Sequence, residues 1–396
     1  MKMLYAAVAA VALLPAAAAA GEKTVSGSSN GLSWTAKSTI VGQSSTGTLA
    51  SGGNPLYMAP NSAGYSGVVG LLMTYQNGSQ FVCSGSLLTS GKILTAAHCV
   101  SDGYWKTDGG VAAGLIRTQV LFQNAASSAA DAAIYGIPSG VTAIDVAGYN
   151  INVSYTGEVI DQNDIAVLTL AQAAPAFAQA YDIFTGGDLT GDEFNVTGYG
   201  TRSTNGGALG VDTDPITGFP NAGSGRRRQG NNIYDYRWGD AAFDGFFTDR
   251  DANGENFFGT AQVEYSYISD FDNSLAANDA ACRIALAVGA SAQFCQRGLG
   301  LTEVSIAGGD SGGAAFIDGR IASINSYGLS FGTGFGDYRA GLQSSWGEFN
   351  GFVPTFIHAD FINGVPEPGT WAMMILGFGF VGGALRRRGK SQLSFA

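Results

Sequence analysis

Short apolar runs separated by turn residues follow one another from about residue 65 to residue 350. They include SGVVGLLMTY, FVCSGSLLT, KILTAAHCV, DIAVLTLA, EFNVTGYG and GGAAFIDGRIASINSYG. Each run has the length of a strand, is rich in β-branched or aromatic residues, and is bounded by Gly, Asn or Asp. The pattern predicts an all-β protein, built as a sandwich or a pair of barrels. In the second half, NDAACRIALAV is the one clear helical candidate.

The N-terminal part and one internal segment depart from this pattern. Residues 1–20 contain a lysine, an apolar run and small residues in an A-x-A pattern, which is typical of a secretory signal peptide. Residues 21–63 are rich in Ser, Gly and Thr, and we expect a loosely ordered lead-in. Residues 201–259 are expected to be a long insertion, ordered in part by its aromatic residues. The arginine run 226–228 is expected in a solvated loop.

The C-terminal segment combines three features in order. A Pro-Glu-Pro at 366–368 is followed by the uncharged stretch 370–385 and then by three arginines at 386–388. The stretch is slightly shorter than the roughly 20 residues that span a bilayer comfortably, and the arginines would hold its far end on the cytoplasmic side. We therefore expect a C-terminal hydrophobic helix that crosses the membrane and anchors the exported protein transiently in the inner membrane.

Residues 365–388 resemble the PEP-CTERM sorting signal of Gram-negative bacteria in the order of these features. The resemblance implies an exosortase-type sorting enzyme as a partner and delivery to the cell surface or the extracellular space. Signal peptidase is expected to act at the other end of the chain, after residue 20.

Charge and composition narrow the class of protein. Only 13% of the residues are charged, the chain has 59 glycines, and the formal net charge is −11. Such an acidic chain is not expected to bind nucleic acid. Export permits disulfides, and the cysteines at 83, 99, 282 and 295 allow three connectivities, of which pairing within each close couple is the natural expectation. With no C-x-x-C and two histidines, a structural zinc site is not expected.

The segment IAGGDSGGAAF, at 306–316, is too poor in side chains to pack a core. Glycines flank Ser311 on both sides. Because glycine lets the backbone turn sharply, a substrate carbonyl could lie over the N–H groups of Gly309 and Ser311. This arrangement is typical of an acyl-transfer nucleophile, whereas a plain glycine turn is the alternative.

A serine nucleophile needs a base and a group that orients the base. His98, in LTAAHCV, is favoured over His358, in PTFIHADF, which lies close to the sorting signal. Asp164 opens the apolar strand DIAVLTL, a position from which a desolvated carboxylate can orient an imidazole.

The segments TAAHC, DIAVL and GDSGG, in this order, resemble the three signatures of the trypsin-like (chymotrypsin-fold) serine peptidases. VTGYG and INSYG resemble two further strands of that family. The resemblance covers residues 64–350 and implies two six-stranded antiparallel β-barrels with the active site in the cleft between them. To this fold the sequence adds the insertion and the C-terminal hydrophobic helix.

The resemblance also implies roles for individual residues. Ser311 would be the nucleophile, His98 the general base and Asp164 the orienting carboxylate. The N–H groups of Gly309 and Ser311 would form the oxyanion hole, and Ser326 would support Asp164. The cysteine pairs Cys83–Cys99 and Cys282–Cys295 match two family disulfides.

Four residues are implied in substrate binding: Ser305, Ser326, Gly328 and Gly336. Many trypsin relatives place an aspartate where this chain has Ser305, so an apolar P1 residue is expected rather than a basic one. A shift of one residue in the alignment would put Asp337 in the pocket instead.

Two further features leave alternatives open. Asp249, Asp251 and Asn253 resemble the start of a calcium loop, but the closing glutamate is absent, so no metal or other cofactor is expected and an acidic surface turn is favoured. In the trypsin-like family a new N-terminus pairs with the aspartate before the nucleophile. Ile40 could supply that ammonium to Asp310, or Asp310 could bond to nearby polar groups, which is slightly favoured.

The sequence thus predicts a secreted serine endopeptidase that acts on protein or peptide substrates. The alternative from another class is a catalytically silent surface or adhesion protein on a peptidase scaffold. A single-domain membrane protein is a third hypothesis, with only the C-terminal stretch in its favour.

Overall fold

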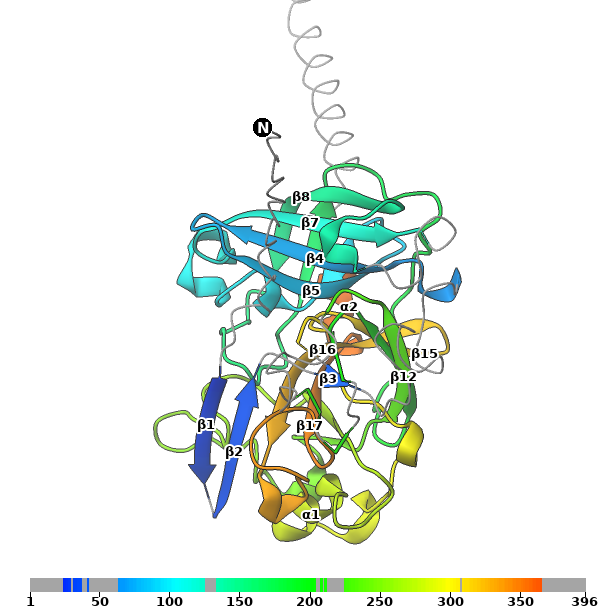
Figure 1. Ribbon diagram of the computed structural model, residues 1–396. Helices are drawn as coiled ribbons and strands as arrows, with labels where there is room; N and C mark the ends of the chain where they lie inside the picture. The colour runs from blue at the N-terminus through cyan, green and yellow to red at the C-terminus, as the bar shows by residue number, and fades with distance from the viewer. Residues whose placement is uncertain are drawn as a thin grey trace, which may run out of the picture.

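The computed structural model describes residues 24–29, 31–37, 41–42, 63–124, 133–203, 207–208, 210–211, 224–306 and 308–364. The predicted signal peptide, residues 38–40 before the β3 strand, and the sorting segment 365–388 lie outside this part of the chain. The described residues form two antiparallel β-structures, one above the other in Figure 1, with few helices. The predicted all-β architecture of the chymotrypsin type is confirmed.

The first structure is a closed barrel of six strands in the order β4-β5-β6-β9-β8-β7. Its strands are β4 (Val68–Tyr75), β5 (Gln80–Leu87), β6 (Ile93–Thr95), β7 (Leu115–Gln123), β8 (Val141–Ile151) and β9 (Ala166–Leu170). The apolar runs of β4, β6 and β9 lie almost wholly buried, which fits strands packed inside a small barrel. Closure leaves no unpaired strand edge in this half of the molecule.

The second structure is a half-barrel, an open sheet of nine strands rather than the expected closed barrel of six. Seven of its strands lie in the order β12-β10-β15-β16-β17-β14-β13, and β16 also pairs with β2, which pairs with β1. The bounds are β1 (Thr24–Ser29), β2 (Leu32–Lys37), β10 (Glu193–Gly198), β12 (Arg228–Ile233), β13 (Tyr236–Arg237), β14 (Tyr267–Asp270), β15 (Ala314–Ile317), β16 (Arg320–Ser330) and β17 (Phe349–Pro354). Two further strands, β3 (Val41–Gly42) and β11 (Thr201–Arg202), form a separate parallel pair.

The hairpin β1–β2 comes from the segment expected to be a loosely ordered lead-in. Leu32, Trp34 and Ala36 alternate with polar residues and are buried, whereas the overall Ser/Gly composition hides this period of two. Trp34 packs edge-on against Phe258 at 5.4 Å between ring centroids. The hairpin therefore adds two strands to the second sheet.

The segment expected as an insertion is built into the fold more fully than its composition indicates. Its aromatic residues Tyr234, Tyr236, Trp238 and Phe243 are all buried. The prediction of a solvated arginine loop is wrong for Arg227 and Arg228, which are 1% and 7% exposed. Arg228 begins β12 and pairs with Gly198 of β10, and Arg227 donates from Nη1 to the carbonyl of Tyr65 at 2.7 Å.

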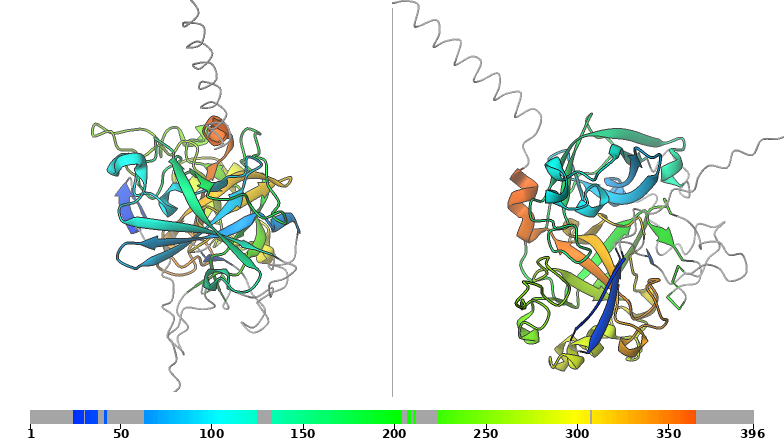
Figure 2. Two further views of the ribbon diagram at one scale, coloured as in Figure 1. Left: turned by 90° about the horizontal axis from the view of Figure 1, so that it is seen from above. Right: turned by 90° about the vertical axis from the view of Figure 1, so that its left-hand side faces the viewer.

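Helices are short and lie at the margins of the sheets. The predicted helix is α1 (Ala280–Ala287), and Asp279 caps it by accepting a hydrogen bond from the amide of Cys282. Helix α2 (Ala359–Gly364) lies beside the junction of the two halves (Figure 2), and its Ile362 joins the core of the first barrel. Single turns of 3₁₀-helix are η3 (Ala63–Tyr65), η4 (Ala97–Cys99), η5 (Tyr104–Lys106), η6 (Asp108–Gly110), η7 (Ile134–Gly136), η8 (Ala241–Phe243), η9 (Ala292–Phe294), η10 (Gly300–Thr302), η11 (Thr333–Phe335) and η12 (Phe356–His358).

The prediction of a transmembrane helix is contradicted. Across the part of the chain that the structure describes, no helix combines the length and the apolar character needed to cross a bilayer. The stretch 370–385, on which the prediction rested, lies outside that part.

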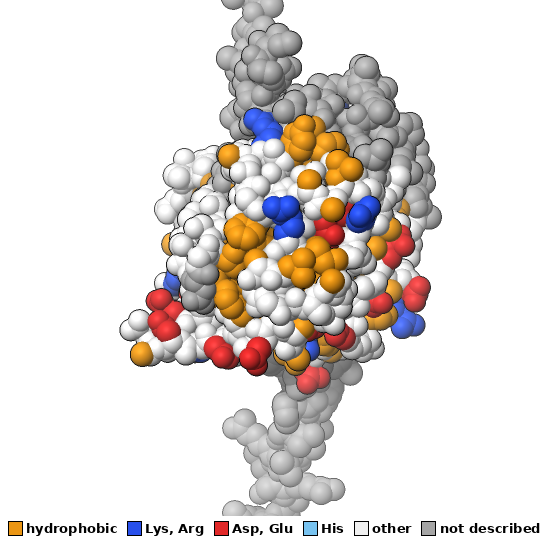
Figure 3. All heavy atoms as spheres, turned by 90° about the horizontal axis from the view of Figure 1, so that it is seen from below, with side chains coloured by type: hydrophobic (Ala, Val, Ile, Leu, Met, Phe, Trp, Pro, Cys, Tyr) orange, Lys and Arg blue, Asp and Glu red, His pale blue; other side chains and the backbone are white. Residues whose placement is uncertain are grey.

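At the lower end of the molecule, apolar side chains lie between separated charged groups (Figure 3). Leu275 and Leu286 are among the exposed apolar residues of the protein.

Candidate active site

His98 and Asp164 meet at the end of the first barrel. His98 lies in η4 directly after β6, and Asp164 lies just before β9, which pairs with β6. Asp164 Oδ1 accepts from the His98 amide at 2.7 Å, and its Oδ2 is 2.7 Å from His98 Nδ1. Both side chains are almost wholly buried, at 6% and 2% exposed. The pairing of β6 with β9 therefore fixes the imidazole against the carboxylate.

Ser326 completes this network from the second sheet. Its hydroxyl donates to Asp164 Oδ2 at 2.6 Å, so one carboxylate oxygen accepts from both Ser326 and the imidazole. A carboxylate anion only accepts hydrogen bonds, so against it Nδ1 would carry the imidazole hydrogen and Nε2 would keep its lone pair. His98 Nε2 is buried and has no hydrogen-bond partner among the described residues. A nitrogen in this state can accept a proton from a neighbouring hydroxyl.

Ser311 lies in the turn before β15, beside the segment that leads to His98. Gly309 and Gly312 have φ values of +100° and +78°, which favour glycine. A Cβ on Gly312 would lie 2.1 Å from Thr95 Oγ1 and 2.7 Å from the Ala96 amide nitrogen. The turn is thus pressed against the residues just before His98, and only glycine fits there.

Ser84, which the sequence analysis missed, holds this turn. Its amide donates to the carbonyl of Ser311 at 2.8 Å, and its hydroxyl donates to the carbonyl of Gly309 at 2.7 Å. The same hydroxyl accepts from the amide of Tyr199 at 2.9 Å. Ser84 follows Cys83, which is joined to Cys99 by a disulfide, and the second disulfide joins Cys282 to Cys295. The one sequence signal that could have identified Ser84 is its position beside a cysteine near the histidine strand.

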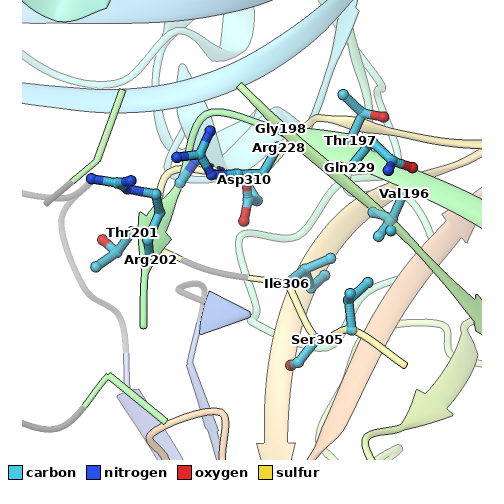
Figure 4. Close-up of a pocket in the computed structure, with 13 residues that line it drawn as sticks. Val196, Thr197, Gly198, Thr201, Arg202, Arg228, Gln229, Ser305, Ile306 and Asp310 are labelled. Carbon is cyan, nitrogen blue, oxygen red and sulfur yellow. Dashed lines mark hydrogen bonds between the residues drawn. The ribbon is translucent and has the colours of Figure 1, made fainter. Parts of the chain in front are cut away.

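Asp310 points away from this turn, toward β10 and β11. Its Oδ1 accepts from the amide of Gly200 at 2.7 Å, and a Cβ on Gly198 would lie 2.0 Å from that same oxygen. Figure 4 shows Asp310 in a pocket with Arg202 and Arg228, and with Ser305 and Ile306 at its other end. Beside this pocket the backbone of β3 runs parallel to β11, with Val41 opposite Thr201.

The residues expected from the sequence to bind the substrate lie on different segments of the second half of the molecule. Ser326 and Gly328 lie on β16, where Gly328 is paired with Asn350 of β17. Gly336 follows η11, and a Cβ there would lie 3.0 Å from the Cβ of Ala280 in α1. The residue opposite Gly328 is Asn350, which the sequence analysis missed.

Asn350 closes the space next to Ser305. Its Oδ1 accepts from the Ser305 hydroxyl at 2.6 Å and from the Ile306 amide at 3.1 Å, and its Nδ2 donates to Ser269 Oγ at 3.3 Å. Asp337 lies further along, where its Oδ2 accepts from the Gly332 amide at 3.0 Å and from the hydroxyl of Ser330. Burial raises the pKa of Asp337 to about 7. The wall beside Ser305 thus consists of uncharged polar groups.

Two neighbouring ionisable residues are structural. Asp161 accepts from the amides of Thr156 and Asn163, and burial raises its pKa to about 6. His358 Nε2 is 2.8 Å from the carbonyl of Gln162, and burial lowers the pKa of this imidazole. His358 therefore supports the loop before Asp164, and it does not compete with His98.

Residues 249–256, which resemble the start of a calcium loop, are held by hydrogen bonds to their own backbone. Asp251 Oδ1 accepts from the amides of Asn253 at 2.8 Å and Glu255 at 3.0 Å, which lowers the pKa of this exposed carboxyl. A Cβ on Gly245 would lie 2.5 Å from the carboxylate oxygens of Asp249. Asp251 thus stabilises a turn through its own backbone neighbours.

Comparisons with known proteins match two separate segments of the chain. Residues 63–235 match the family model described as Trypsin, and residues 364–388 match the one described as PEP-CTERM protein-sorting motif. No curated protein matches the chain. Among solved structures, HL collagenase and neuropsin, a serine protease expressed in the limbic system of mouse brain, are each 16% identical, with a TM-score of 0.43. Both matches cover 77% of this chain, and 96% and 95% of the respective solved chains. The chain therefore carries a trypsin-family domain, followed by a PEP-CTERM sorting motif that implies export to a surface or membrane-associated location.

Proposed function

We propose that this protein is a serine endopeptidase that acts outside the cytoplasm on protein or peptide substrates. The observation that carries the proposal is the network in which Asp164 holds His98 by Nδ1 and is itself held by Ser326, with His98 Nε2 left unpartnered among the described residues. The trypsin-family match supports the reaction class. The rival, a silent surface protein on a peptidase scaffold, would have no use for this network.

The proposed reaction begins with attack of Ser311 Oγ on the scissile carbonyl carbon. His98 Nε2 takes the serine proton as the C–O bond forms, and Asp164 stabilises the resulting imidazolium. The oxyanion would be bound by the N–H groups of Gly309 and Ser311. His98 then gives the proton to the leaving amine as the C–N bond breaks. Water, activated by the same nitrogen, releases the acyl group and restores Ser311.

We also propose that substrates carry an apolar P1 residue. Ser305 and Asn350 satisfy each other's polar atoms, so this wall offers no charge to a lysine or arginine. Asp337 is engaged with Ser330 and Gly332, and its raised pKa favours the neutral form below about pH 7. Because Asn350 narrows the space opposite Gly328, small and medium apolar side chains fit the proposal best.

Two processing steps complete the proposal. Signal peptidase would remove residues 1–20, and an exosortase-type enzyme would act at the sorting motif. No cofactor is part of the proposed chemistry, which draws on side chains and backbone amides of this chain.

Labelling with a fluorophosphonate tests the central proposal. This probe reacts with serines activated by a base, and the adduct is mapped by mass spectrometry of tryptic peptides. We expect one adduct, on Ser311, and none in His98→Ala. A folded wild-type protein that takes no label, or takes it on another serine, would support the silent scaffold.

A further inference from the structure

A group of buried carboxylates lies in the second sheet, away from His98 and Ser311. Asp270 ends β14, Asp272 follows two residues later, and Glu303 comes directly after η10. Each of the three offers a carboxylate oxygen within 4.8 Å of one from the other two. Their exposed fractions are 3%, 0% and 0%, so water cannot screen their charges effectively.

Two more carboxylates enlarge the negative charge. Asp235 Oδ2 accepts from the amide of Asp270 at 2.7 Å, and Asp279 caps α1 nearby. Charge repulsion from Asp272 raises the pKa of both Asp235 and Asp279, although burial is the larger cause in each. Burial raises the pKa of Asp272 and of Asp279, and the positive charge of Arg297 offsets part of the rise in each. Five acidic groups thus lie in or beside one buried cluster.

Hydrogen bonds engage four of the six oxygens of the three central carboxylates. Glu303 accepts from the amides of Asp272 at 2.8 Å and Leu299 at 2.7 Å, and Asp270 Oδ2 accepts from the amide of Ala281 at 2.9 Å. Asp272 Oδ1 accepts from the amide of Ser274 at 2.6 Å. Asp272 Oδ2, however, is buried and has no hydrogen-bond partner among the residues that the structure describes. A wholly buried carboxylate oxygen without a donor is costly unless a cation or a proton reaches it.

We propose that Asp270, Asp272 and Glu303 form a binding site for one calcium ion. Ca²⁺ takes six to eight oxygen ligands at about 2.3–2.6 Å, so two oxygens on opposite sides of the ion lie up to about 5 Å apart. Three carboxylate oxygens within 4.8 Å of one another can share such an ion. Mg²⁺ is a poorer fit, because it demands near-ideal octahedral geometry and keeps most of its waters. The ion would supply the positive charge that the buried cluster lacks.

The site has a structural consequence for the neighbouring pocket. Glu303 lies two residues before Ser305, and Asp270 pairs with Phe349, the residue before Asn350. A bound ion would tie β14 to the segment that leads to the Ser305–Asn350 contact. Calcium is therefore expected to act by positioning this wall, and it takes no part in bond making or breaking.

Calcium titration of the chelator-treated full-length protein tests the proposal. We expect one bound Ca²⁺ by calorimetry and a melting temperature that rises by several degrees in its presence. Asp272→Asn keeps the shape and the acceptor for Ser274 but removes the charge, so it should weaken Ca²⁺ binding at least tenfold. Asp251→Asn, in the exposed loop that resembles a calcium loop, is the matched control and should leave binding unchanged.

A terbium experiment gives a second measurement that needs no substitution in the cluster. Tb³⁺ also prefers oxygen ligands, and its luminescence is excited through a nearby tyrosine. Tyr236 is close, because its hydroxyl donates to the carbonyl of Ala281 at 3.4 Å and the amide of Ala281 donates to Asp270 Oδ2. We expect Tb³⁺ luminescence that excess Ca²⁺ abolishes and that Tyr236→Phe lowers severalfold. Absence of Ca²⁺ binding by the wild type, or loss of it in Asp251→Asn, would overturn the proposal.

Discussion

Ser326 of the second sheet donates a hydrogen bond to Asp164 of the first barrel, on the same oxygen that faces His98 Nδ1. The carboxylate is therefore oriented from both halves of the molecule.

Asp164→Asn would place an amide donor or a weaker acceptor against His98 Nδ1. It would thereby favour the imidazole tautomer in which Nε2 carries the hydrogen and cannot act as a base. We expect kcat to fall by about 10⁴-fold, with the melting temperature little changed.

Ser326→Ala is a milder change to the same hydrogen-bond network than Asp164→Asn. It removes one hydrogen bond from a buried carboxylate but leaves the charge in place, so we expect a loss of about tenfold to a hundredfold in kcat/KM. Steady-state kinetics with a peptide substrate measures both variants. A larger loss for Ser326→Ala than for Asp164→Asn would show that Ser326 acts on the substrate and not through Asp164.

The nucleophile and the base should behave as one unit. Ser311→Ala and His98→Ala are each expected to lower kcat by about 10⁴-fold or more, with the double variant little worse, because attack and proton transfer are coupled. Near-wild-type hydrolysis by Ser311→Ala would rule out the assignment. Thr197→Ser, a buried residue on β10, serves as a control for handling and folding.

Much of this site could be predicted from the sequence, because its parts lie in short segments with fixed local geometry. His98, Asp164 and Ser311 each lie beside a strand whose apolar run is visible in the sequence, and the glycines around Ser311 signal a strained turn. Asn350 could not be found in this way. Its importance comes from its register opposite Gly328, and register between distant strands is set by packing across the sheet.

The same limit explains the errors outside the site. The Ser/Gly-rich composition of residues 21–63 hid an alternation that was only four or five residues long. The arginines at 227 and 228 were expected in solvent because charge is usually exposed. Arg228 instead begins the strand that pairs with β10, and Arg227 donates to the carbonyl of Tyr65. In both cases a tertiary pairing overrode what local composition indicated.

Asn350 should set the size of the accepted P1 residue. Asn350→Gly removes the side chain that meets Ser305, so we expect the profile of a peptide library to shift from small or medium apolar residues toward Phe and Tyr. Ser305→Ala, which removes the partner and leaves Asn350 in place, is the comparison. A wild-type profile dominated by Lys and Arg would contradict the prediction and implicate Asp337.

Stability should fall as the pH rises from about 5 to 8 in calcium-free buffer. Burial raises the pKa of Asp235 to about 8 and that of Glu348 to about 7, whereas both groups ionise near pH 4 when the chain is unfolded. Between these values the folded state binds more protons than the unfolded state, so the free energy of unfolding decreases with pH. Thermal melts should show a drop of several degrees, with a smaller slope in Glu348→Gln. A flat or rising profile would be inconsistent with these shifts.

Direct sequencing of the N-terminus of the mature protein tests how Asp310 is partnered. A start at Ile40 would support pairing of a new ammonium with Asp310, and the parallel pairing of β3 with β11 brings residue 41 beside the segment that bonds Asp310. Full activity with a start near Gly21 would show that the Gly200 amide and its neighbours suffice for Asp310. We expect the second result, because Thr39 is a poor site for trypsin-like processing.

The position of β2 gives such a cleavage an unusual outcome. Thr35, Ala36 and Lys37 pair with β16 close to Ser326, and Trp34 is 6% exposed. A cut before Ile40 would leave β1 and β2 in a separate peptide, with β2 still paired to the strand that carries Ser326. The mature protein would then be a two-chain assembly held by backbone pairing and by the buried side chains of β2. The two chains would separate on a denaturing gel but elute together from a native column.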